Sequence, residues 1–466
     1  MVLMQSSFVN AQDSNDSVLG YWEASLTVPT GSLRIWMTCS QDENTGQLKV
    51  KLDSPDQGAF DLPVGSASLE GNHLVVQCPK MLANFDGHLT DSMNIQGTWT
   101  QNFKEFPLNF TRKFEPLTFV RPQMPQEPFP YQIDTVEFTS GPKKIKLAGT
   151  LTRPNSSELV PVVILISGSG PQDRDCSLMG HKPFWVIADF LTRNGVAVLR
   201  FDDRGTGKSG GKFNSATSFD FAEDVSAAVD FLKSYPGITP TMIGLAGHSE
   251  GGLIAPIVAS KRDDLAFVIL LAGPASTGRD ILIQQSEAIM KLAGSTKKEI
   301  NHALEINDLV YSVALTDMSY QDAEKKIDNL LKRKYWYRSS SFKRNNRLNE
   351  SGRKMIAAQV LDDWFRTFLS TDPAPYLSKL QIPVLAVFGS KDCQVLPDPN
   401  AARMEKYLTV NGNKHVTVKT MDGLNHLMQH STTGAISEYA MIEETFSPEV
   451  LNLMLNFVQK SCRIRN

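Results

Sequence analysis

Hydrophobic and polar residues follow two different patterns along the chain. Between residues 21 and 114, stretches such as 32–37 and 47–52 alternate apolar and polar side chains. This period of two is typical of a strand with one face buried and the other in water. Turn-forming residues separate the stretches. The pattern predicts a small all-β domain, either a barrel or a sandwich, over residues 21–114.

Farther along, strands of a different kind alternate with helices. Continuous apolar runs rich in β-branched residues are typical of strands buried on both faces of a parallel sheet. Such runs lie at 162–166, 196–201, 242–246, 267–271 and 384–388. Helical periodicity separates several of them, at 184–194, 219–234 and 251–260. This alternation predicts right-handed βαβ units and an α/β fold with a doubly wound, mostly parallel sheet.

One insertion interrupts the alternation. Residues 275–379 show helical periodicity and few β-branched runs, which predicts a helical cap. Within it, the stretch Lys325–Lys354 has eleven basic residues against two acidic ones, so its net charge is 11 − 2 = +9. We interpret this stretch as a solvated helical face. The alternative is a cap that attracts anionic substrates.

The patterns divide the chain into consecutive segments. The linker is recognised by the four prolines among residues 121–130, which make it stiff. The predicted segments are a leader at 1–20, the β domain at 21–114, the linker at 115–132, an α/β domain at 133–274 and 380–466, and the helical cap at 275–379.

Composition narrows the classes of protein that the chain can belong to. It has 466 residues, of which 41% are hydrophobic and 21% charged, as in ordinary globular proteins. The net charge of −3 provides no electrostatic basis for binding nucleic acid. No uncharged apolar run reaches about 18 residues, so we expect no membrane span. Five cysteines without a Cys-x-x-Cys pair indicate neither a disulfide scaffold nor a zinc site.

The first residues support two hypotheses. Residues 1–12 lack a basic start and a proper apolar core, but Val9-Asn10-Ala11 is similar to a signal-peptide cleavage site. We interpret the segment as the remnant of a signal peptide, which predicts a periplasmic or secreted protein. The alternative is a disordered N-terminus on a cytoplasmic protein.

The most informative segment is Gly247-His248-Ser249-Glu250-Gly251-Gly252. It follows a predicted buried strand directly and opens an apolar helix. Gly-x-Ser-x-Gly in that setting is typical of a nucleophile elbow, a strained strand-to-helix turn that exposes a serine hydroxyl. The helix N-terminus adds free N–H groups that stabilise negative charge. Ser249 is therefore the candidate nucleophile.

A serine hydroxyl needs a base that removes its proton and an acid that orients the base. In a fold with this elbow, the acid follows the serine in the chain and leaves a late strand. Asp392 comes directly after the predicted strand 384–388 and is the candidate acid. Asp398 and Asp422 are alternatives with poorer placement.

The base is expected after the last strand and before the terminal helix. Residues 416–421 have the pattern of that strand, and His426 lies in the loop that follows. His426 is therefore the candidate base, with His430 as the alternative.

Attack by a serine on a carbonyl carbon also requires two N–H donors for the oxyanion of the tetrahedral intermediate. One is expected to be the backbone N–H of Glu250, the residue after the nucleophile. We place the second at Ser169, in the glycine-rich loop 167–174, with Gly168 or Gly170 as alternatives. Small residues there let the backbone approach a ligand.

The loop 202–210 contains Gly-Lys-Ser, which suggests a nucleotide site. The P-loop pattern, however, requires an earlier glycine where this chain has Asp202. We interpret the loop as held by a local ion pair of Arg204. No organic cofactor or metal is expected.

Taken together, these segments resemble the α/β-hydrolase superfamily, and within it bacterial serine esterases with an N-terminal β domain. The motifs that carry the resemblance lie at 52–58, 97–101, 167–174, 203–209, 247–252 and 389–395. The resemblance implies a carboxylesterase for short- to medium-chain acyl esters, with a triad of Ser249, Asp392 and His426.

The mechanism expected from these residues is two-step acyl transfer to Ser249, with a small-molecule ester as substrate. Fold and triad do not determine the leaving group, so a serine peptidase or an acyl thioesterase is the related alternative. A different alternative is a non-catalytic module whose β domain binds glycans. The sequence has no signal for an oligomeric state.

Overall fold

The chain forms two compact units in a computed structural model that describes residues 17–28, 31–42, 45–57, 59–336 and 348–465. The first unit comprises residues 1–120 with 437–443, and the second comprises 121–436 with 444–466. Nearly all of the predicted leader lies outside the described residues, as does the part of the basic stretch at 337–347.

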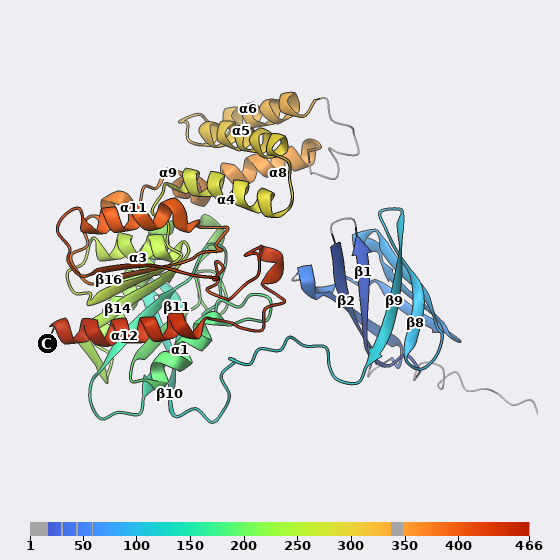
Figure 1. Ribbon diagram of the computed structural model, residues 1–466, viewed down its shortest axis with the longest axis horizontal. Coiled ribbons are helices and arrows are strands. Elements are labelled where there is room, and N and C mark those ends of the chain that lie inside the picture. Colours follow the sequence, from blue (N-terminus) through green and yellow to red (C-terminus); the bar gives the residue numbers. More distant parts are fainter. Residues whose placement is uncertain (1–16, 29–30, 43–44, 58, 337–347, 466) are drawn as a thin grey trace, which may run out of the picture. The chain divides into compact units, whose positions relative to one another are not determined.

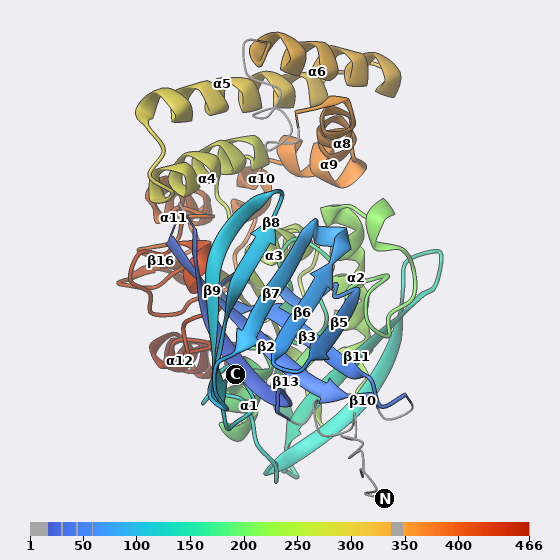
Figure 2. The same cartoon turned by 90° about the vertical axis from the view of Figure 1, so that its right-hand side faces the viewer.

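The first unit is built around a single antiparallel sheet (Figure 2). The sheet order is β4-β3-β2-β1-β9-β8-β7-β6-β5, and β3 lies in contact with β5. The strands are β1 (Gly20–Val28), β2 (Gly31–Gln41), β3 (Leu48–Ser54), β4 (Ala59–Leu62), β5 (Ser66–Glu70), β6 (His73–Cys78), β7 (Ala83–Leu89), β8 (Asn94–Gln101) and β9 (Lys104–Lys113). The contact between β3 and β5 brings the two ends of the sheet together, so the sheet is curled. It encloses an apolar core of its own.

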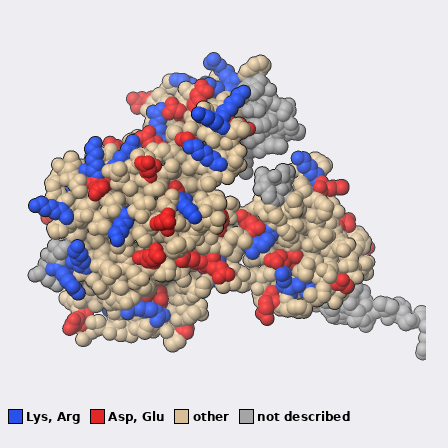
Figure 3. Space-filling model, in the orientation of Figure 1, with Lys and Arg blue, Asp and Glu red and all other residues tan. Residues whose placement is uncertain are grey.

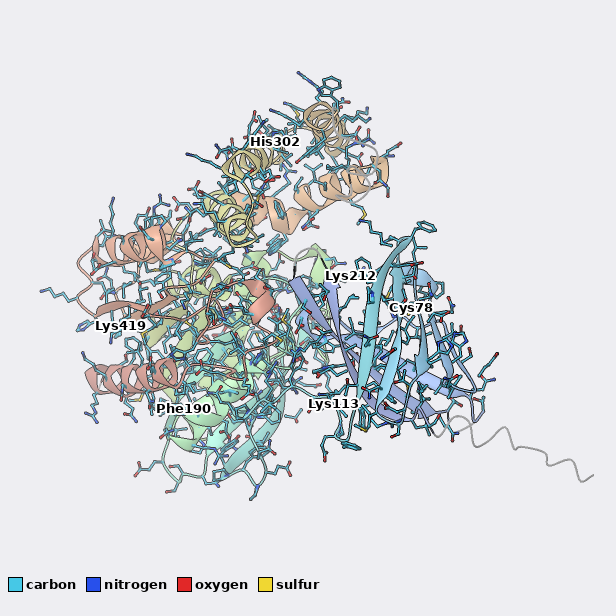
Figure 4. All side chains as sticks on the ribbon, turned by 45° about the vertical axis from the view of Figure 1, so that its right-hand side comes forward. Cys78, Lys113, Phe190, Lys212, His302 and Lys419 are labelled. Atoms are coloured by element: carbon cyan, nitrogen blue, oxygen red, sulfur yellow. The ribbon has the colours of Figure 1, made fainter. Side chains whose placement is uncertain are left out.

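Alternation along the strands creates that core. In β6, Leu74, Val76 and Cys78 are buried, while the residues between them point outward. Cys78 is labelled in Figure 4 among the side chains of this unit. Trp22 of β1 is fully buried, and its indole N–H donates to the carbonyl oxygen of Val18 over 2.7 Å. The alternating pattern of the sequence therefore correctly indicated half-buried strands.

The second unit contains a mostly parallel sheet of order β10-β11-β13-β12-β14-β15-β16-β17. Its strands are β10 (Tyr131–Ser140), β11 (Ile145–Pro154), β12 (Val160–Ile166), β13 (Ala197–Phe201), β14 (Ile238–His248), β15 (Phe267–Leu271), β16 (Val384–Gly389) and β17 (Val416–Met421). Neighbouring strands among β13, β12, β14, β15, β16 and β17 pair in parallel. β10 and β11 form an antiparallel edge. The predicted buried strands are all present.

Helices cover both faces of this sheet (Figure 1). α1 (Pro183–Arg193) and α12 (Pro448–Arg465) pack on one face. α2 (Ser218–Lys233), α3 (Gly251–Ala259), α10 (Ala374–Leu377) and α11 (Pro397–Thr409) pack on the other. The strands are apolar throughout because they are buried between these two layers. The doubly wound α/β prediction is confirmed.

The region between β15 and β16 is helical in its described residues. It contains α4 (Gly278–Leu292), α5 (Lys297–Ala314), α6 (Tyr320–Lys334), α8 (Glu350–Val360) and α9 (Asp363–Ser370). These helices share a small apolar core of their own that includes Ile327 and Leu369. Lys and Arg side chains project from their surface among acidic ones in Figure 3. Two of the basic residues pair with acids one helical turn away, Lys332 with Asp328 and Lys354 with Glu350.

None of the helices in the described part of the chain is long and apolar enough to cross a membrane.

A buried ion pair holds the loop after β13 to α2. The guanidinium of Arg204 donates to both oxygens of Asp224, over 2.7 and 2.8 Å, and both side chains are almost completely buried. The local ion pair expected for Arg204 is thus present. It matters for stability because removing one member leaves the other charge buried without a partner.

We predict that Arg204→Met lowers the free energy of unfolding by about 3–5 kcal/mol, because Asp224 loses its counter-charge. The measurement is urea denaturation followed by circular dichroism. Lys291→Met is the matched control, since Lys291 pairs with Glu287 on an exposed helix face and should cost less than about 1 kcal/mol. Equal effects of the two substitutions would contradict the prediction.

Candidate active site

Ser249 lies on a tight turn between β14 and α3. Its φ of +56° is in the left-handed region, which non-glycine residues avoid. The flanking glycines leave no room for a side chain. A Cβ on Gly247 would lie 2.0 Å from the carbonyl oxygen of Gly251, and a Cβ on Gly251 would lie 2.3 Å from that of Ile166. This geometry is that of a nucleophile elbow.

Asp392 and His426 come from two different loops and meet in the interior. Asp392 follows β16, His426 follows β17, and His426 Nδ1 lies 2.8 Å from Oδ2 of Asp392. Both side chains are almost completely buried. The other carboxylate oxygen of Asp392 accepts the backbone N–H groups of Gln394 and Val395. The carboxylate is thereby held in one orientation and can fix the imidazole with Nε2 pointing away from it.

His248, the residue before Ser249, links the elbow to the loop that carries His426. Its Nε2–H donates to the backbone carbonyl of His426 over 2.8 Å, and the centroids of the two imidazole rings are 4.8 Å apart. Burial and the neighbouring His426 lower the pKa of His248 to about 4. His248 is therefore neutral near pH 7, with its proton on the nitrogen that donates.

The contact expected between Ser249 and His426 is not formed in the described residues, which include no hydrogen bond between the Ser249 hydroxyl and the His426 imidazole. The nearest link is His248, which precedes Ser249 in the chain and donates to the backbone carbonyl of His426. In enzymes without substrate, a hydrogen bond of this kind is often long and shortens in the substrate complex. The structure therefore joins Asp392 to His426 directly and brings His426 to the elbow through His248.

Two backbone N–H groups beside Ser249 have no acceptor in the part of the chain that the structure describes. Ser169, Ser249 and Glu250 line one cavity. Within the described part of the chain, the N–H groups of Ser169 and Glu250 make no hydrogen bond. A Cβ on Gly168 would lie 3.2 Å from that of Ser249, so the glycine loop runs directly past the Ser249 side chain. The geometry has the unpaired donors that an oxyanion requires.

Asp203 fixes this glycine loop by hydrogen bonds to two of its residues. Its carboxylate accepts the Ser167 hydroxyl over 2.7 Å and the Gln172 backbone N–H over 3.0 Å. Burial, together with the nearby acids Glu250 and Asp224, raises the pKa of Asp203 to about 7. Sequence reasoning missed this role, although two consecutive acidic residues after the buried strand β13 were a usable signal.

Asp202 holds the far end of the same loop. Its carboxylate accepts the backbone N–H of Arg174 over 2.8 Å and the Arg174 guanidinium over 2.6 Å. Asp202 stands where a P-loop would have glycine, and its side chain binds protein groups rather than leaving space for a phosphate.

The side chain of Glu250 connects three elements. One carboxylate oxygen accepts the Ser218 hydroxyl of α2 over 2.6 Å and the Trp364 indole N–H of α9 over 2.9 Å. Burial raises the pKa of this carboxyl group. Sequence reasoning considered only the backbone of Glu250, because nothing local relates it to a tryptophan 114 residues away.

Most of the remaining residues that line the cavity are apolar, and Gln285 and Gln394 are the polar ones. Ile281 and Leu282 come from α4, and Trp364 and Phe368 come from α9, where their rings stack with centroids 5.6 Å apart. The cavity has a volume of about 60 Å³. Among the described residues, no cluster of three metal-ligating side chains lies around it.

Known proteins are similar to this chain in sequence. The family model described as serine aminopeptidase, S33, matches residues 184–432. Esterase EstD of Thermotoga maritima is 25% identical over 284 residues, which are 60% of this chain and 58% of EstD. Thiohydrolase aneE of Aspergillus aculeatus is 41% identical over 69 residues, which are 15% of this chain and 22% of aneE. The chain thus matches less than two thirds of the length of either curated relative.

Solved structures are similar to it more remotely. The Pyrococcus furiosus esterase Pf2001 has a TM-score of 0.43 and 17% identity, over 74% of this chain and 99% of that one. Est1E of Butyrivibrio proteoclasticus has a TM-score of 0.40 and 21% identity, over 69% and 96%. The family model covers more than half of the chain, and the protein therefore belongs to the serine aminopeptidase S33 family of α/β-hydrolases.

Proposed function

We propose that this protein is a serine carboxylesterase that hydrolyses short- to medium-chain acyl esters through an acyl-enzyme intermediate. The observation that carries the proposal is the hydrogen bond of 2.8 Å between the buried side chains of Asp392 and His426. A carboxylate that orients an imidazole toward a serine elbow is the arrangement that nucleophilic acyl transfer requires.

In the proposed mechanism, Ser249 Oγ attacks the ester carbonyl while His426 Nε2 takes its proton. Asp392 keeps the imidazole oriented and stabilises its charged form. The N–H groups of Ser169 and Glu250 stabilise the oxyanion. His426 then protonates the departing alcohol. In the second step, His426 removes a proton from water, which attacks the acyl carbonyl. As the bond from the acyl carbon to Ser249 Oγ breaks and the acid leaves, His426 returns the proton to Ser249 Oγ.

We assign the helical region 275–379 the role of a cap over the α/β domain at 133–274 and 380–466. The support is the cavity beside Ser249, whose wall includes apolar residues of α4 and α9. At about 60 Å³, the cavity is smaller than the roughly 150 Å³ that takes up benzene. A cavity of this size favours the short end of the proposed range of acyl chains.

The charges around the cavity favour a neutral ester over a peptide with a free amino group. Of the described residues that line it, only Glu250 carries an ionisable side chain. That carboxyl group is already bonded to Ser218 and Trp364 and is buried. A site for an α-ammonium group would need an available acidic group, so an ester hydrolase fits these residues better than an aminopeptidase.

We predict that Ser249→Ala lowers kcat for p-nitrophenyl butyrate by roughly 10⁴-fold or more, because the nucleophile is lost. Labelling with a fluorophosphonate should disappear in the same variant. Ser260→Ala, at the end of α3, is the matched control and should keep both activity and labelling. Turnover of the ester by Ser249→Ala at the wild-type rate would exclude the mechanism.

Comparison of leaving groups tests the substrate class separately. We expect kcat/KM to be higher for p-nitrophenyl acetate and butyrate than for aminoacyl anilides or acyl-CoA. A preference for anilides would favour a peptidase and a preference for acyl-CoA a thioesterase. An absence of fluorophosphonate labelling in the wild type would favour a non-catalytic module.

Enlarging the cavity should change chain-length preference. Leu282→Ala removes apolar volume from the wall, so we predict a shift of the best p-nitrophenyl ester toward longer acyl chains. The measurement is kcat/KM for esters from acetate to decanoate. Leu309→Ala is the control, because Leu309 is a partly exposed residue of α5 outside the cavity wall. An identical profile in both variants would contradict the assignment of the acyl pocket.

A further inference from the structure

Strands β6 and β7 of the first unit carry three potential metal ligands on one face. His73 of β6 lies directly opposite His88 of β7 in the ladder, and Asp86 precedes His88 by two residues. Residues two apart on a strand share a face, so all three side chains point to the same outward side of the sheet. Ligand atoms of the three lie within 4.8 Å of one another, and the described residues contain no other such group.

The side chains are already in contact. His73 Nε2 lies 2.8 Å from Oδ1 of Asp86, and the rings of His73 and His88 are stacked with centroids 4.4 Å apart. In a tetrahedral zinc site with bonds near 2.0–2.1 Å, neighbouring donor atoms are about 3.4 Å apart. The distances between the donor atoms here range from 2.8 Å up to at most 4.8 Å, on both sides of that value. Small side-chain rotations therefore bring the three donors around one ion.

The electrostatic surroundings favour a cation. None of the four strands β5, β6, β7 and β8 contains Lys or Arg. Glu70 of β5 lies directly opposite His73 on its other side. The side chains of His73 and Asp86 are 37% and 54% exposed, so an ion can reach them and keep water as a further ligand.

We propose that His73, Asp86 and His88 form a binding site for a divalent transition-metal ion of the Zn²⁺ class. Two imidazoles and one carboxylate are a donor set that suits zinc and its neighbours rather than Mg²⁺ or Ca²⁺. The ion takes the place of the hydrogen bond between His73 and Asp86 and joins β6 to β7. Its ligands come together only in the folded sheet, so binding stabilises this unit. The proposal is independent of the proposed esterase activity.

The test uses the full chain without a histidine tag, freed of metal by chelation. Isothermal titration with ZnCl₂ should show one ion bound per chain. Co²⁺ in place of Zn²⁺ should give the visible absorption of a low-symmetry nitrogen and oxygen site. His73→Ala and His88→Ala should each weaken Zn²⁺ binding by at least about tenfold. Loss of a residue that only hydrogen-bonds to a metal ligand already costs about that much, and loss of a ligand itself should cost more.

Asp86→Asn tests the carboxylate without changing the size of the side chain and should also weaken binding. His415→Ala removes an exposed histidine of the other unit and should leave the affinity unchanged. Excess Zn²⁺ should raise the melting temperature of the wild type and of His415→Ala but not of His73→Ala. An absence of binding by the wild type, or equal binding by the His73→Ala/His88→Ala double variant, would overturn the proposal.

Discussion

The arrangement of the second unit depends on one steric constraint, the reversal of the chain between β14 and α3. No side chain fits at Gly247 or Gly251, and Ser249 is held at a φ of +56°. A strained turn of this kind persists only when its surroundings over-determine it. Here the surroundings are a central strand of the sheet and a helix, α3, that is buried on every side. The packing of the whole sheet therefore maintains the half-buried Ser249 and the N–H group of Glu250, which has no acceptor among the described residues.

Around that turn, polar groups are buried but bonded. Asp203, Glu250 and Asp392 each accept at least two hydrogen bonds from the protein. Burial of an unpaired polar group would cost several kcal/mol, so each bond also restricts the loop that carries it. Asp203 thereby fixes the glycine loop to the loop after β13, and Asp392 fixes the loop of His426 to the loop after β16. Glu250 fixes α2 and α9 to the elbow. Preorganisation of donors and acceptors before substrate arrives is what electrostatic stabilisation of a transition state requires.

Local sequence patterns indicated much of this structure in advance. Periodicity predicted the buried strands and the helices that cover them, because burial on one or two faces requires apolar residues at regular positions along the segment. Chain order and loop position selected Asp392 and His426 over Asp422 and His430, and the structure places the first two in contact. His430 instead bonds to Glu444 at an exposed position. The catalytic roles of the selected residues remain the subject of the proposed experiments.

The sequence by itself determined the strands, the elbow and the loops in which the candidate residues lie, since these depend on neighbours along the chain. Tertiary structure alone decided which distant groups meet: His248 with the carbonyl of His426, Glu250 with Trp364, and His73 with His88. Such contacts depend on strand register and on how helices pack across a sheet. A shift of one residue in register would turn His73 to the other face, and no pattern within a single segment specifies that register.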